Sequence, residues 1–259
     1  MIKKGLVSIT FRQFSPEKII NLAKSNGLSC IEWGSDVHVP VGNMEKAAEI
    51  AALMKKSQLE SISYGTYYRL GTYENPVEEF MKYLETAKVL EAKNLRLWAG
   101  VKEADDYTAA EKIALVKEAK QLCKIAKEHG MTVSFEYHHG TLTGTTEGAL
   151  ELIENIDEDN AFLYWQPNQF KTNEYNMQGL EKVKNYVSNV HIFHWDASKR
   201  FTLEEGITVW KKYLRKLEGN RAVLMEFVKE DSEEQFVADA ISFGKIVREE
   251  NNKHGTYTI

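Results

Sequence analysis

Short apolar runs alternate with segments of helical periodicity along the whole sequence. The apolar residues in these runs are nearly continuous rather than alternating, which is typical of parallel strands that are covered on both faces. The segments between them have apolar residues at three- and four-residue steps, which predicts a helix after each strand. The predicted strands cover residues 5–10, 28–33, 59–64, 94–99, 131–137, 161–166, 189–194 and 222–228.

Several predicted helices have recognisable ends. The first has Ser15 as its N-cap, Pro16 at the first helical position and Gly27 just past its end. Before the last helix, Ser232 and Gln235 stand in capping-box spacing. The other helices are predicted over about 43–56, 76–90, 108–129, 146–155, 177–185 and 203–217.

Eight strand–helix units of about thirty residues each are the number that a (β/α)8 barrel requires. The competing fold, a doubly wound open sheet, often has a glycine-rich turn after its first strand. Here FRQFSP follows the first strand instead. No linker or low-complexity stretch divides the chain, and it contains only four prolines. We therefore predict an α/β fold, a (β/α)8 TIM barrel that forms a single domain over residues 1–259.

The charge and the cysteines narrow the class of protein. Thirty-three basic and thirty-eight acidic residues give a net charge of -5, so no broad positive field is available to bind nucleic acid. Cys30 and Cys123 fit no zinc or redox spacing, which favours packing roles in a reducing compartment. No apolar run approaches the ~20 residues of a membrane span, and the start of the chain lacks the apolar core of a signal peptide. We expect a cytoplasmic protein without a nucleic-acid or membrane partner; the oligomeric state stays open, a homo-oligomer included.

Polar residues occur late in the last four predicted strands, where the active site of such a barrel lies. One buried glutamate alone would be explained equally well by a structural ion pair. Four strands together favour a shared divalent cation, because burying unpaired carboxylates costs several kcal/mol and coordination removes that cost. Two carboxylates, an imidazole and an amide oxygen suit Mn²⁺, Mg²⁺ or Co²⁺, with Zn²⁺ as a further candidate. The residues are Glu136 in TVSFEYHH, Gln166 in LYWQPN, His191 and His194 in NVHIFHW, and Glu226 in LMEFVK.

The sequence resembles the xylose isomerase-like barrels, which include sugar-phosphate isomerases and epimerases. The resemblance extends over essentially the whole chain and rests on GLVSITFRQFSPEKIINLAKSNGLSCIEWGSDVHVP, YGTYYRLG, LRLWAG, FEYHHGTLT, WQPN, VHIFHW and MEFV. It implies one divalent cation, held by Glu136, Gln166, His191 and Glu226. Gln166 stands where the family has a carboxylate, which predicts weaker metal binding. Three-residue spacing places His191 and His194 on opposite faces of a strand, and His191 is preferred as the ligand because it follows NV as the family's ligand does.

The chemistry that the resemblance implies moves a proton between adjacent carbons of a sugar through a cis-enediolate. The cation polarises the carbonyl, while Glu136 and Glu226 remove and return the proton on opposite faces. The expected activity is therefore a divalent-metal-dependent isomerase or epimerase of a sugar or sugar phosphate.

Further residues near strand ends are candidates for binding the substrate. Arg200 is the preferred contact for a phosphate, since similar proteins place an arginine shortly after the histidine of the seventh strand; Arg69, Arg96 and Lys199 are the other cations. For each charged residue the alternative is a solvated surface charge or a local hydrogen bond, and for Trp98 it is core packing. The candidate substrate-binding residues are His138, His194, Arg200, Glu32, His38 and Trp98.

Three other functions remain open at this point. A dehydratase of cyclitols or keto sugars would use the same barrel, metal and acid–base pair, since a fold does not fix a reaction. A carbohydrate-binding barrel that has lost its metal is supported mainly by Gln166. An endonuclease acting at abasic DNA sites belongs to a related branch that clusters several metals, and seven histidines with a net charge of -5 argue against it.

Overall fold

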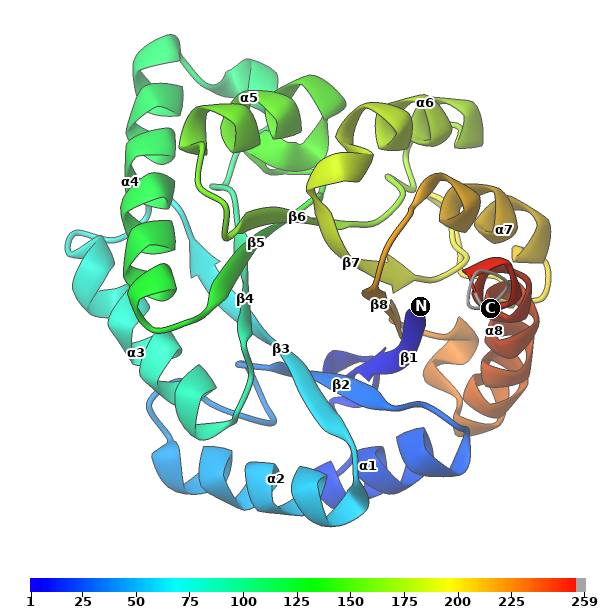
Figure 1. Cartoon of the computed structure of the whole chain (residues 1–259). Helices are drawn as coiled ribbons and strands as arrows, with labels where there is room; N and C mark the ends of the chain where they lie inside the picture. Colours follow the sequence, from blue (N-terminus) through cyan, green and yellow to red (C-terminus); the bar gives the residue numbers. More distant parts are fainter. Residues whose placement is uncertain (255–259) are drawn as a thin grey trace.

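Eight parallel strands form a closed barrel in chain order, with β8 paired to β1 (Figure 1). The structure, a computed structural model, describes residues 1–254 and the side chains of residues 1–248. The predicted (β/α)8 architecture is confirmed. The strands are β1 (Ile2–Val7), β2 (Cys30–Gly34), β3 (Glu60–Arg69), β4 (Asn94–Trp98), β5 (Thr132–Glu136), β6 (Ala161–Trp165), β7 (Val187–Ile192) and β8 (Arg221–Met225).

A helix follows each strand, and the helices form an outer ring around the barrel (Figure 1). Ser15 caps the first of them as predicted, because its side chain accepts a hydrogen bond from the Lys18 backbone N–H. The helices are α1 (Pro16–Ser25), α2 (Met44–Ser57), α3 (Pro76–Val89), α4 (Ala109–Glu128), α5 (Thr146–Ile156), α6 (Asn173–Val183), α7 (Ile207–Lys216) and α8 (Glu233–His254).

Two helix starts differ from the prediction. α6 begins at Asn173 rather than near residue 177, since the Thr172 side chain caps the Tyr175 N–H and adds a turn. α7 begins at Ile207, because residues 203–206 form a turn that ends at Gly206. Both differences lie next to the loops that follow the strands.

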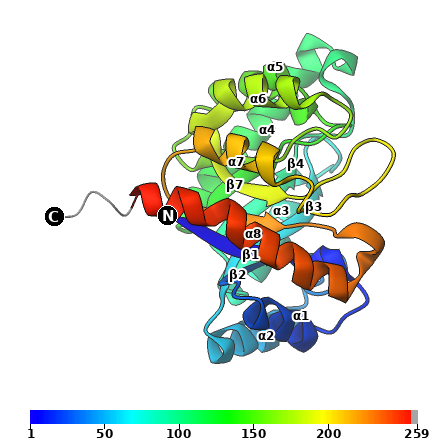
Figure 2. The same ribbon diagram turned by 90° about the vertical axis from the view of Figure 1, so that its right-hand side faces the viewer.

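The main apolar core lies between the sheet and the ring of helices. A smaller apolar cluster fills the inside of the barrel and includes Val7, Cys30, Tyr164 and Leu224. Towards the C-terminal ends of the strands the interior becomes polar, and this is where the candidate site lies. In the side view the N-terminus lies at the left, and the loop between β7 and α7 projects at the opposite side (Figure 2). Within the described residues, no helix is long and apolar enough to cross a membrane.

Candidate metal and acid-base site

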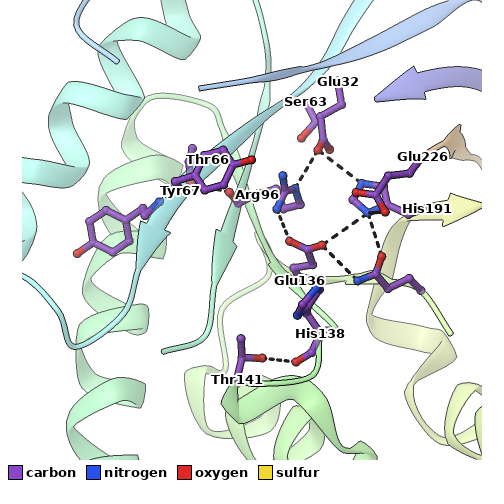
Figure 3. Close-up of polar contacts among 12 residues, drawn as sticks. Glu32, Ser63, Thr66, Tyr67, Arg96, Glu136, His138, Thr141, His191 and Glu226 are labelled. Atoms are coloured by element: carbon purple, nitrogen blue, oxygen red, sulfur yellow. Dashed lines mark hydrogen bonds and ion pairs between the residues drawn. The ribbon is translucent and has the colours of Figure 1, made fainter. Parts of the chain in front are cut away.

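Six buried polar side chains meet inside the barrel at the ends of its strands (Figure 3). Three carboxylates, one guanidinium, one imidazole and one amide come from six different strands or from the residues directly after them. Their exposed fractions are 5% or less, so solvent can do little to compensate their charges. The six are Glu32 on β2, Arg96 on β4, Glu136 on β5, Gln166 just after β6, His191 on β7 and Glu226 just after β8.

His191 lies at the centre of the predicted metal ligands. Its Nδ1 is 3.5 Å from Glu226 Oε2, 3.7 Å from Glu136 Oε1 and 3.4 Å from Gln166 Oε1. One atom each of Glu136, His191 and Glu226 can be chosen so that all three lie within 4.8 Å of one another. Two ligands bonded at ~2.1 Å to one cation are themselves about 3.0–3.5 Å apart. The four predicted ligands are therefore brought together at separations close to those of a metal site.

Metal binding at Nδ1 needs the tautomer that carries the proton on Nε2, a nitrogen with no hydrogen bond in the described part of the chain. Without a metal, the contact of Nδ1 with Gln166 Oε1 would instead take a proton on Nδ1. His191 Nε2 lies 3.5 Å from Glu32 Oε1, so a proton on Nε2 faces a carboxylate. That leaves the lone pair of Nδ1 pointing at Glu136, Glu226 and Gln166. Glu32 therefore acts behind the histidine, on the side away from the three predicted ligands.

The sequence analysis did not predict the role of Arg96. It was a candidate for binding phosphate, yet its Nε donates to Glu32 Oε1 at 2.9 Å and its Nη1 donates to Glu136 Oε2. Gly65 makes room for this contact: a Cβ there would lie 2.7 Å from Arg96 Nη2 and from Glu32 Oε1. The opposite charges of Glu32 in CIEW and Arg96 in LRLW, each within an apolar strand, were the signal for this pair.

The charges around the imidazole shift its pKa and those of its neighbours. Burial alone would raise the pKa of Glu32, but the Arg96 guanidinium and the His191 imidazole lower it to about 2. Burial, and then the charge of Glu136, raise the pKa of Glu226 although His191 opposes this. Burial would lower the pKa of His191, but Glu226 and Glu32 raise it. At His191, the carboxylates therefore raise the pKa by more than burial lowers it.

The net charge of the cluster fits a divalent cation. Three carboxylates and one guanidinium leave two negative charges when His191 is neutral. A divalent cation beside Nδ1 would balance them, in a place where burial makes an unbalanced charge costly. The donor set, two carboxylates with an imidazole and an amide oxygen, is one that Mn²⁺, Mg²⁺, Co²⁺ and Zn²⁺ accept.

A cavity of about 200 Å³ opens directly above these ligands. Of the predicted substrate contacts, Trp98 and His138 line it, and their rings lie 4.5 Å apart. Six other lining residues were not singled out as contacts from the sequence. Ile9 lies in a short 3-10 helix and Tyr67 in the part of β3 where the pairing with β4 shifts, and the other four lie in loops whose paths a sequence pattern does not fix. Besides Ile9, the six are Arg12, Tyr67, Gln169, Trp195 and Phe227.

Three other predicted contacts lie outside this cavity. His38 is buried, with its ring nitrogens bonded to Ser8 Oγ at 3.1 Å and to the Phe14 carbonyl at 3.2 Å. His194 lines a separate cavity of about 340 Å³ between the loops after β6 and β7. Arg200 binds the Asp231 carboxylate.

Phe227 follows Glu226 with a φ of 52°, a left-handed conformation that is rare for a bulky side chain. The Thr10 hydroxyl accepts a hydrogen bond from the backbone N–H of Phe227 at 3.1 Å, which holds this conformation. The turn carries the Phe227 ring to the wall of the cavity while Glu226 stays among the predicted ligands. Such strain is typical of functional sites.

Comparison with known proteins identifies relatives with this architecture. Over 166 residues the chain is 26% identical to 3-dehydroshikimate dehydratase of Bacillus anthracis, a stretch that covers 61% of this chain and 59% of that protein. Over 131 residues it is 30% identical to inosose isomerase of Halalkalibacterium halodurans, covering 50% of this chain and 46% of that protein. The chain thus spans about half the length of the curated relatives that it matches.

A solved structure and a family match extend the likeness over nearly the whole barrel. The structure of the IOLI protein with a zinc atom superposes with a TM-score of 0.73 at 17% identity, covering 95% of this chain and 98% of that one. The family model described as Xylose isomerase-like TIM barrel matches residues 20–245. This chain therefore belongs to the xylose isomerase-like TIM barrel family.

Proposed function

We propose that this protein is an isomerase or epimerase that moves a proton at the carbon beside the carbonyl group of a small polyhydroxylated compound, a sugar or a related cyclic polyol. The observation that supports it most is the approach of Glu136, Gln166 and Glu226 to Nδ1 of His191, at 3.4–3.7 Å, beneath a cavity of small-molecule size. The names of the relatives, an isomerase and a dehydratase, agree with such proton chemistry.

Glu136, Gln166, His191 and Glu226 would hold one divalent cation, which when bound polarises the substrate carbonyl and acidifies the neighbouring C–H bond. The two glutamates have different surroundings. Arg96 binds Glu136 directly and holds one of its carboxylate oxygens, whereas among the described residues no hydrogen bond or ion pair joins Glu226 to an arginine or lysine. Glu226 is therefore the better group for taking the proton, and Glu136 for staying an anionic ligand.

A dehydratase is the second candidate, and the match to 3-dehydroshikimate dehydratase favours it. The first step would be the same removal of a proton beside the carbonyl. The electron pair would then expel a hydroxyl group from the next carbon, and a protonated side chain would supply the proton that releases it as water. The same residues serve both reactions, so the substrate decides between them.

The test is proton NMR in D2O with manganese-free, magnesium-loaded protein and a panel of ketoses, aldoses, their phosphates, cyclitol ketones and 3-dehydroshikimate. Isomerisation with deuterium at the carbon beside the carbonyl is expected. Loss of a hydroxyl group with formation of a double bond would select the dehydratase. Glu226→Gln should reduce turnover by about 100-fold to 10,000-fold, with metal content measured on each variant, and the exposed Glu147→Gln serves as control. If the metal-loaded protein catalyses neither reaction on any of these compounds, the proposal is contradicted.

A further inference from the structure

The wall of the cavity has a different hydrogen-bonding character from its floor. The floor consists of carboxylates and an amide, which suit hydroxyl groups. Arg12, Trp98 and Trp195 line the wall and mouth, and their side chains offer N–H groups but no acceptor. The indole N–H groups of Trp98 and Trp195 are buried and have no acceptor within the described part of the chain. Tyr67, His138 and Gln169 also line the cavity and can accept hydrogen bonds, and both indole nitrogens are closed to solvent. The accessible charged donor of the wall is therefore Arg12.

Arg12 is held at the mouth in a fixed position. It follows a short 3-10 helix (Ser8–Phe11) after β1, and its Nε donates to Asp36 Oδ2 at 2.6 Å. Its Nη2 donates to the Tyr67 hydroxyl at 2.7 Å, and Nη1 makes a long contact of 3.4 Å with the Ile9 carbonyl. A guanidinium has five N–H groups, so two remain for a ligand. The side chain is 42% exposed, which leaves it accessible.

Arg12 and Arg96 are the two arginines among the residues that line the cavity, and no lysine lines it. Arg96 is bound on both sides by Glu32 and Glu136. Arg12 is paired with Asp36, and its hydrogen bonds go to Asp36, Tyr67 and Ile9 rather than to a predicted metal ligand. An anionic substituent on a substrate would therefore meet Arg12 when the reacting end lies over Glu136 and Glu226.

We propose that the Arg12 end of the cavity is a subsite for a carboxylate of the substrate, so that the substrate is a hydroxylated oxo acid rather than a neutral sugar. This rests on the proposed function and specifies its substrate class. A carboxylate needs donors and gains from a positive charge, and the two remaining N–H groups of Arg12 supply both at a fixed position. A phosphate dianion is less suited, because Asp36 already offsets the charge of Arg12 and the cavity holds about 200 Å³.

Arg200, the arginine preferred from the sequence, is the matched comparison. It too pairs with an aspartate, Asp231, but its guanidinium lies over the rings of Trp195 and Phe227 and its Nη1 also donates to the Val228 carbonyl. It does not line the cavity. Arg12→Met and Arg200→Met remove the same groups from two arginine–aspartate pairs, of which only the Arg12 pair contributes its arginine to the cavity.

The experiment measures equilibrium binding, so it does not depend on turnover. Magnesium-loaded wild type, Arg12→Met, Arg12→Lys and Arg200→Met are titrated with shikimate and its methyl ester, quinate and its methyl ester, and fructose and fructose 6-phosphate. Each acid and its methyl ester share their hydroxyl groups and differ in the anion, and fructose 6-phosphate carries a phosphate in place of one hydroxyl group of fructose. Wild type should bind at least one acid about tenfold or more tightly than its ester. Arg12→Met should abolish that preference, Arg12→Lys should restore part of it, and Arg200→Met should keep it.

The proposal is overturned if no acid binds better than its ester, if Arg12→Met keeps the preference, or if Arg200→Met loses it instead. A larger gain for fructose 6-phosphate over fructose than for any acid over its ester would replace the carboxylate by a phosphate. Failure of the proposed function looks different: acids would bind through Arg12 while no compound is turned over. Circular dichroism of each variant checks that the fold is intact.

Discussion

At the scale of single residues, Arg96 determines the electrostatics of the site. Its guanidinium is buried between Glu32 and Glu136, and it reduces the negative charge that gathers around His191. The arginine also fixes Glu136 while leaving Glu226 without a guanidinium partner. One cation thus gives two chemically identical glutamates different surroundings.

Replacing Arg96 by methionine should destabilise the metal-free protein by about 3–5 kcal/mol, because two buried carboxylates lose their partner. Urea unfolding in the presence of a chelator measures this. Arg200→Met, which breaks a partly exposed pair with Asp231, should cost about 1 kcal/mol or less. Adding Glu32→Gln to Arg96→Met should recover part of the loss, since it removes one of the two uncompensated charges. Equal effects of the two arginine variants would contradict this role for Arg96.

Gln166 should limit the affinity for the metal. Its Oε1 lies 3.4 Å from His191 Nδ1, while its Nε2 donates to Glu136 Oε1 at 3.3 Å. Gln166→Asp exchanges a neutral donor for a carboxylate, so it should tighten Mn²⁺ binding in calorimetric titrations and also lower the melting temperature of the metal-free protein through added repulsion. The two effects have opposite signs, which separates them from a general change in stability. Unchanged Mn²⁺ affinity would show that Gln166 is not a ligand.

At the scale of elements, the sequence predicted all eight strand–helix units because burial on both faces makes the strands apolar and the helices periodic. It placed Glu136, Gln166, His191 and Glu226 together because the ends of parallel strands meet at one end of a barrel. His191 lies on β7 and points inward among the predicted ligands, whereas His194 lies in the loop after the strand, and its side chain reaches a different cavity.

The loops limited what the sequence could predict. Arg12 lies in the loop after β1, and Tyr67 lies near the end of β3. No periodic pattern in the sequence indicates that these two side chains reach the cavity. Phe227 reaches it through a left-handed backbone conformation that its residue type disfavours. Arg200 was expected to bind substrate from its order after His191, whereas its own aspartate and two aromatic rings occupy it. Chain order locates a side chain along the barrel rim but does not set its direction.

At the scale of the whole molecule, the ligands are far apart in sequence and close only in the closed barrel. Glu136 and Glu226 come from strands that are joined through β6 and β7, and an unfolded chain presents no such site. A cation bound there stabilises the folded state by RT ln(1 + [L]/Kd), about 2.7 kcal/mol at a hundredfold excess over Kd. Metal binding and global folding are therefore linked.

Chelation should accordingly lower the melting temperature of the metal-loaded protein by about 5–10 °C under those conditions. Scanning calorimetry with Mg²⁺ or Mn²⁺ and then with excess chelator measures the shift, and elemental analysis confirms the loading. His191→Gln should abolish most of the shift, because it removes the imidazole that faces the other three predicted ligands. His194→Gln is the matched control on the same chain segment: it lines the other cavity and should keep the full shift. If His194→Gln abolishes the shift and His191→Gln keeps it, the metal binds between the loops after β6 and β7 instead of in the barrel.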